Sequence, residues 1–119
     1  MAVSWQMGQV ISYTVRVWDD SFPRLGYSHS IGLKVEGADS DTAFPTVALL
    51  FYPEGTALPV NTLTDEGYFV HTSHKHFSEY VDLLRNEGPD YVWIGTHDDG
   101  RISHVFGTGA EPPGEGELY

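Results

Sequence analysis

The sequence predicts an α+β domain in which a mainly antiparallel β-sheet carries one helix packed on one face. Three observations lead to this prediction: segments in which apolar and polar residues alternate, a single stretch with helical spacing, and two strand-like segments on either side of Asp99-Gly100. The expected order of elements is β-β-β-(β)-α-β-β, where the bracket marks a short strand. This order favours a sheet layer and a helix layer around one core.

The first three elements are predicted to be strands. Apolar and polar residues alternate between Gln9 and Trp18, which predicts a half-buried strand, and the same alternation returns over residues 31–36. Residues 46–52 are almost continuously apolar, which is typical of a strand covered on both faces, so we expect this strand to be the central one. The apolar positions of the first strand are Ile11, Tyr13, Val15 and Val17, and its polar positions are Ser12, Thr14 and Arg16.

The middle of the chain is predicted to hold a long loop and the helix. Residues 53–67 are rich in Pro, Gly, Thr and Asn, which indicates an irregular segment, and residues 68–70 are expected to add a short strand. From Ser73 onward, apolar residues recur at helical spacing until Gly88 and Pro89. Ser73 or Thr72 is a suitable N-cap, and the Gly-Pro pair is a suitable stop.

The pair Asp99-Gly100 predicts a β-hairpin with a two-residue type I′ turn. With that loop, Ile94 faces Val105 and Trp93 faces Phe106, so that apolar residues meet across the two strands. In this register His104 lies opposite Gly95, on the same strand face as Ile102 and Phe106. We therefore expect His104 to be a core or interface histidine.

The length of 119 residues fits one domain, which we place at residues 1–108. Residues 109–119 form a Gly, Pro and Glu segment with little tendency to form regular structure, and we expect it to be a C-terminal tail. The tail carries acidic and apolar residues suited to docking on a basic groove of a partner. These candidate partner-binding residues are Glu111, Glu115, Glu117, Leu118 and Tyr119.

The composition limits the partners and the compartment. Six Lys and Arg residues against 17 Asp and Glu residues give a net charge of −11, so nucleic acid is an unlikely ligand. The chain has no cysteine, lacks a signal-peptide pattern and has no run of about 20 apolar residues, so we expect a cytoplasmic protein without a membrane span. The partner is expected to be another protein, with a basic surface as one option.

His71, His74 and His76 form a candidate metal site. Three imidazoles are able to bind zinc and leave a position for water. Residues two apart on a helix point to different sides, however, so His74 and His76 would converge only in an unwound turn. We favour cap or solvent roles for these histidines and keep the metal site as an alternative.

Other arrangements of reactive residues do not predict a catalytic site. The segment from His97 to Gly100 resembles an acid–base group, but Asp and Gly are also the residues that a hairpin turn prefers. The sequence has no G-x-S-x-G segment, no Gly-rich phosphate loop and no calcium-loop spacing. We therefore expect no enzymatic activity, no catalytic residues and no cofactor.

The favoured function is a small acidic, non-enzymatic protein-binding or adaptor domain that self-associates through its sheet as a homo-oligomer. A sheet with one helix leaves its other face open, and the many aromatic residues suggest an exposed aromatic patch there. One alternative is an acidic inhibitor or immunity-type protein that covers a cationic site. The others are a metal-dependent enzyme that uses the histidine group and a single-strand nucleic-acid binder that stacks bases on aromatic side chains.

Overall fold

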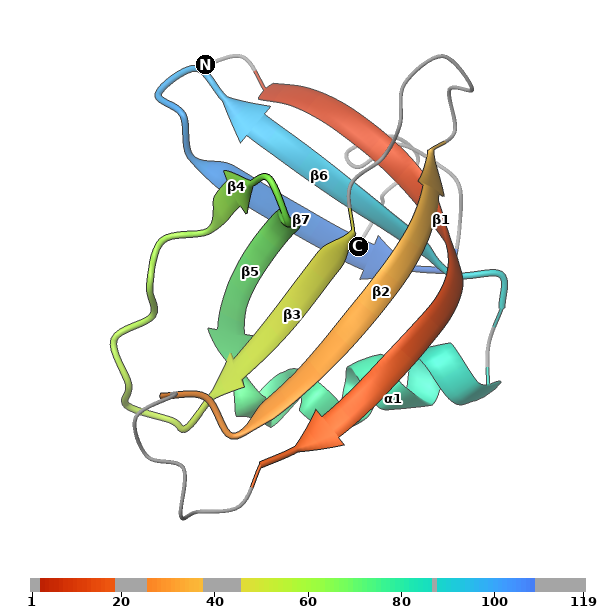
Figure 1. Cartoon of the computed structure of the whole chain (residues 1–119), viewed down its shortest axis with the longest axis vertical. Helices are drawn as coiled ribbons and strands as arrows, with labels where there is room; N and C mark the ends of the chain where they lie inside the picture. Colours follow the sequence, from red (N-terminus) through yellow and green to blue (C-terminus); the bar gives the residue numbers. More distant parts are fainter. Residues whose placement is uncertain (1–2, 19–25, 38–45, 87, 109–119) are drawn as a thin grey trace, which may run out of the picture.

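A computed structural model of the chain describes residues 3–18, 26–37, 46–86 and 88–108. Its strands are β1 (Val3–Val17), β2 (His29–Gly37), β3 (Val47–Tyr52), β4 (Thr62–Thr64), β5 (Gly67–Ser73), β6 (Tyr91–His97) and β7 (Ile102–Gly107) (Figure 1). One turn of 3₁₀ helix (His74–His76) leads into the helix α1 (Phe77–Asn86). None of the helices within these ranges has the length and apolar character needed to cross a membrane.

All seven strands belong to one curved sheet of order β4-β5-β3-β2-β1-β6-β7, which forms a half-barrel (Figure 1). The prediction of a mainly antiparallel sheet with the order β-β-β-(β)-α-β-β is wrong. The sheet is mixed, because β3 and β5 run parallel from Val47 opposite Tyr68 to Tyr52 opposite Ser73. The predicted central strand, β3, is also displaced, since β2 holds the middle position.

The parallel pair depends on the connection between β3 and β4. The chain leaves β3 at Tyr52, returns along the molecule over residues 53–61 and enters β4, which pairs antiparallel with β5. A parallel neighbour needs such a crossover, since the chain must come back to the end at which the first strand began. The segment predicted to be one irregular loop therefore contains both this return and a strand.

Buried apolar residues from several strands form the core, and α1 covers it. Ile31, Leu49 and Phe51 are fully buried in the sheet, and Leu84 of α1 packs with them. The aromatic ring of Phe51 contacts the rings of Phe77 and Tyr80 edge-on, with ring centroids 5.1 and 5.3 Å apart. We call the sheet face that carries these residues the inner face and the opposite one the outer face.

The hairpin between β6 and β7 forms where the sequence predicts it, but its register differs by one residue. The His97 N–H donates to the Arg101 carbonyl and the Gly100 N–H donates to the His97 carbonyl, both at 2.9 Å. The loop thus has three residues, with Gly100 at a φ of 89° in the left-handed region. Ile94 consequently lies opposite His104, and Trp93 lies opposite Val105.

Asn61, which precedes β4, joins two strands that are distant in the sheet order. Its Nδ2 donates to the carbonyl of Ile102 in β7 (2.9 Å), and its Oδ1 accepts from the N–H of His71 in β5 (2.7 Å). In the sheet order β7 is the last strand, and β5 is the second, next to β4 at the other end. The Asn61 side chain therefore bridges the open side of the half-barrel.

Candidate interaction surface

The two halves of β1 have different neighbours. Val3 to Gln9 pairs with β6, and the stretch from Gly8 to Val17 pairs with β2. At Val10 the backbone N–H donates to the Asp90 carbonyl at 3.0 Å. Beyond this point, no strand of the described ranges pairs with the other side of β1. We call residues 11–17 of β1 the free edge, which is about 23 Å long at about 3.3 Å per residue.

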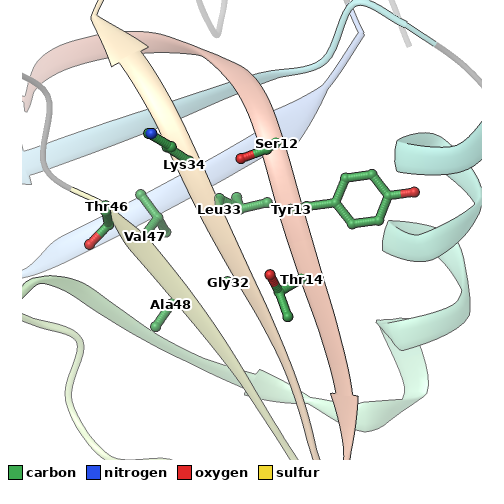
Figure 2. Close-up of a pocket in the computed structure, with 9 residues that line it drawn as sticks. All are labelled: Ser12, Tyr13, Thr14, Gly32, Leu33, Lys34, Thr46, Val47 and Ala48. Atoms are coloured by element: carbon green, nitrogen blue, oxygen red, sulfur yellow. The ribbon is translucent and has the colours of Figure 1, made fainter.

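The apolar side chains of the free edge are exposed, although the sequence pattern predicts a half-buried strand. Tyr13 and Val15 lie opposite Leu33 and Ile31 of β2, which are fully buried core residues, so the inner face extends outward to the free edge. Figure 2 shows the ring of Tyr13 directed toward α1. The exposed fractions are 51% for Ile11, 39% for Tyr13, 37% for Val15 and 68% for Val17. The apolar side chains at this border of the core are therefore exposed, because α1 does not cover them.

β1 has no acidic residue, a feature that it shares with every other strand except β2. The chain has 17 acidic residues, and Arg16 is the only charged side chain of β1. A register shift between Val10 and Ser12 marks a bulge where the free edge begins. The strand itself therefore adds no carboxylate to the repulsion between two copies of the acidic chain.

The outer face beside the free edge is hollowed, with a depression of about 400 Å³ (Figure 2). The depression lies over Gly32, where an added Cβ would meet no atom within 4 Å. Its polar rim consists of Ser12, Thr14, Lys34 and Thr46. The two faces of the free edge thus differ: hydroxyl groups line the outer face, and apolar groups line the inner one.

A second cavity, of about 370 Å³, lies between α1, β5 and β7. Inside it the Tyr80 hydroxyl and the His104 Nε2 are 2.6 Å apart. At its rim the exposed His76 Nδ1 and Glu79 Oε1 are 3.2 Å apart. Thr72, Leu83 and Phe106 complete the lining.

The protonation states of Tyr80 and His104 favour a structural hydrogen bond over acid–base chemistry. Burial lowers the pKa of His104 to about 4, and burial with the nearby charge of Glu79 raises the pKa of Tyr80 to about 12. At pH 7 both groups are neutral, and the tautomer of the imidazole sets which of them donates the hydrogen bond. A general base with a pKa near the working pH is therefore not supplied by this pair.

The structure does not bring His71, His74 and His76 together. The ring of His71 lies near that of Tyr52 on the outer face, with centroids 5.7 Å apart, and the ring of His74 lies 6.2 Å from that of His29. His76 contacts Glu79 at the rim of the second cavity. Within the part of the chain that the structure describes, no three His, Asp or Glu side chains are grouped so that they could hold a metal ion.

Side chains in and beside the hairpin loop form hydrogen bonds that stabilise the turn. The Asp99 carboxylate accepts from the backbone N–H and the Nε of Arg101, at 3.1 and 2.8 Å. The backbone hydrogen bond, followed by the side-chain one, lowers the pKa of Asp99. His97 Nε2 lies 2.7 Å from the Ser103 hydroxyl across the hairpin. These contacts support the structural interpretation that the sequence favoured for this segment.

The predicted partner-binding residues of the tail lie outside the described residues, so that role stays a prediction. Sequence reasoning missed Asn61 and the partner of His104. The alternation of Ile102, His104 and Phe106 is a signal for the buried face of β7, whereas no local signal marks Asn61.

More of the large aromatic side chains are buried than form an exposed patch. Phe51, Tyr52, Tyr68 and Trp93 are buried, while Trp5 and Tyr13 are among the exposed large side chains. Among the described strand segments that lack a neighbouring strand on one side, the free edge exposes the most large apolar side chains.

In comparisons with known proteins, no family model, no curated protein and no solved structure matches this chain.

Proposed function

We propose that the chain is a non-enzymatic protein-interaction domain that binds a partner strand along the free edge of β1. The observation that carries this proposal is the combination, over residues 11–17, of exposed apolar side chains and a strand edge that no other strand of the described ranges pairs with. An added strand would satisfy the backbone N–H and C=O groups of the edge, and its alternate side chains would extend the inner face. Main-chain hydrogen bonds supply affinity in this mode, and the side-chain contacts supply specificity.

The weak protection of this edge supports the proposal. Edge strands commonly carry lysines, prolines, inward-pointing charges or bulges that prevent pairing with other chains. Over residues 11–17 the sequence has no Lys, Pro, Asp or Glu, and only the bulge at its start and Arg16 oppose pairing. Seven residues are long enough for a stable strand contact, since typical strands have about five or six.

The chemistry of the edge also describes its partner. The partner strand would carry apolar residues at every second position, to cover Tyr13 and Val15 on the inner face. Its other positions would be neutral or basic, because the chain has a net charge of −11. The absence of cysteine supports a reducing compartment, and we propose the cytoplasm.

Amide hydrogen exchange in the presence of a strand-forming peptide tests this function. A peptide of residues 10–18 of the chain, fused to a soluble carrier, should protect the amides of residues 11–17 in the domain. Val15→Lys should weaken this binding by about tenfold or more, because a lysine on the inner face would oppose apolar pairing. Val105→Lys is the matched control, since Val105 is 41% exposed in another strand.

Protection elsewhere, or equal weakening by Val15→Lys and Val105→Lys, would contradict strand addition at the free edge. Far-UV circular dichroism and urea unfolding of both variants show whether they retain the fold. Both positions are exposed, so a surface substitution there should change the free energy of unfolding by about 0.5 kcal/mol or less.

A further inference from the structure

We infer that the strand bound at the free edge is the free edge of a second copy, paired antiparallel about a two-fold axis at Thr14. This inference rests on the proposed function and names the partner. A closed symmetric dimer uses the same patch on both copies, so the patch must be complementary to itself. The sequence of the free edge meets this condition in one register.

The pleat of the strand limits the possible registers. Residues opposite each other in an antiparallel pair lie on the same face, so the two inner faces coincide only if the partner numbers sum to an even value. With Thr14 opposite itself, Tyr13 lies opposite Val15 on the inner face, twice by symmetry. Aromatic and β-branched residues form favourable cross-strand pairs. On the outer face, Ser12 lies opposite Arg16, and Thr14 lies opposite Thr14.

Other centres of symmetry fit less well. A centre at Arg16 would place two guanidinium groups directly opposite each other, which is destabilising. A centre at Tyr13 or at Val15 would use only residues 11–15 or 13–17 of the free edge. The centre at Thr14 uses all of residues 11–17, because Thr14 is the middle residue of the free edge.

The charges allow a second copy to pair at this strand. Two chains that each carry −11 repel each other, and β1 is the long strand without a carboxylate. In the Thr14 register each Arg16 faces the neutral Ser12. Lys34 of β2 lies beyond Ser12, about 10 Å from the arginine at two strand spacings, where salt screens the repulsion.

Cysteine cross-linking of the full chain tests the partner and the register together. The chain has no cysteine, so each introduced thiol is unique. In an antiparallel pair the Cα atoms of opposite residues lie about 4.5 to 5.5 Å apart, which suits a disulfide. Under mild oxidation Thr14→Cys should form a covalent dimer about tenfold or more faster than Ser78→Cys, an exposed position on α1.

A mixture of two single variants provides a second test that leaves Thr14 intact. Ser12→Cys and Arg16→Cys should form the mixed disulfide faster than either variant forms its own dimer, because residue 12 faces residue 16 only between copies. Sedimentation equilibrium of the unmodified chain should show a monomer–dimer equilibrium, and Val15→Lys should shift it toward monomer. Equal rates for all thiol variants, with a purely monomeric chain, would overturn the inference.

The outcome separates this inference from the proposed function. If the carrier-bound peptide protects residues 11–17 while the chain stays monomeric and Thr14→Cys does not cross-link, the free edge binds a strand but not a second copy. If neither the peptide nor a second copy occupies the free edge, both proposals fail. A fast Tyr13→Cys or Val15→Cys dimer in place of Thr14→Cys would contradict the register.

Discussion

His104 is a polar residue whose role depends on its neighbours. It lies on the inner face of β7 between Ile102 and Phe106, where its Nε2 is 2.6 Å from the Tyr80 hydroxyl. Burial disfavours the charged imidazolium and so lowers the pKa of His104. The sequence placed His104 on this face, but its partner 24 positions earlier depends on how α1 lies across the sheet.

This environment predicts that acid destabilises the fold through His104. Its pKa is lowered to about 4 in the folded chain from 6.5, so the unfolded chain binds a proton at higher pH than the folded one. The contribution to stability is therefore complete above pH 6.5 and is lost as the pH falls from 6.5 to about 4. The loss is about 3 kcal/mol at 1.36 kcal/mol per pKa unit.

Urea unfolding as a function of pH checks this prediction. His104→Gln keeps an acceptor for the Tyr80 hydroxyl and has no proton to gain, so its free energy of unfolding should fall less steeply between pH 6.5 and pH 4. His76→Gln is the control, because His76 is exposed, and it should keep the slope of the unmodified chain. Parallel curves for His104→Gln and the unmodified chain would show that His104 does not carry the effect.

Among the elements, β1 shows most clearly what a local pattern misses. The alternation of Ile11, Tyr13, Val15 and Val17 predicted a strand, and the structure has one. The same alternation predicted a buried face, but those side chains are exposed, because β6 turns away after Gln9 and α1 does not reach them. A pattern of period two reports the conformation of a strand and which side is apolar. It does not report what covers that side.

At the level of strand connections, we expect the Asn61 side chain to stabilise the fold measurably, because it joins two strands. Asn61→Ala removes the hydrogen bonds to Ile102 and His71 that join β7 to β5. Because both are partly buried, the free energy of unfolding should fall by about 1 to 3 kcal/mol. Asn86→Ala is the control: Asn86 is exposed, its side chain bonds only Asp82 in its own helix, and the expected change is below about 0.5 kcal/mol.

Urea unfolding of the two variants measures this difference, and hydrogen exchange locates it. The amides near Ile102 and His71 should exchange faster in Asn61→Ala than in the unmodified chain. Equal stability of Asn61→Ala and Asn86→Ala would mean that the bridge does not hold the two ends of the sheet.

For the whole molecule, the charge of −11 decides how salt acts on association. Two copies repel over a distance that falls from about 30 Å at 0.01 M salt to about 3 Å at 1 M. Pairing at the free edge is apolar and uses backbone hydrogen bonds, which salt affects little. Sedimentation equilibrium should therefore show tighter dimerisation as salt rises.

The sign of this salt effect distinguishes the proposed dimer from the alternative of an acidic inhibitor. An inhibitor that covers a cationic site would associate more slowly as salt rises, because screening removes electrostatic steering. Weaker self-association at high salt would contradict the arrangement centred on Thr14, since no carboxylate lies in β1 to attract a second copy.

The sequence by itself determined many of the local elements of this protein: strands within β1, β2, β3, β5, β6 and β7, the helix, the place of the last hairpin, and the acidic charge. These features follow from side-chain period, caps and turn residues within short windows. It did not indicate β4 or the part of β1 before Gln9. Only the tertiary structure decided the parallel pairing of β3 with β5, the one-residue change in the hairpin register, the Tyr80–His104 contact and the free edge. Each of these depends on which distant segments lie side by side, and that is determined by burial of the core as a whole, which no local pattern contains.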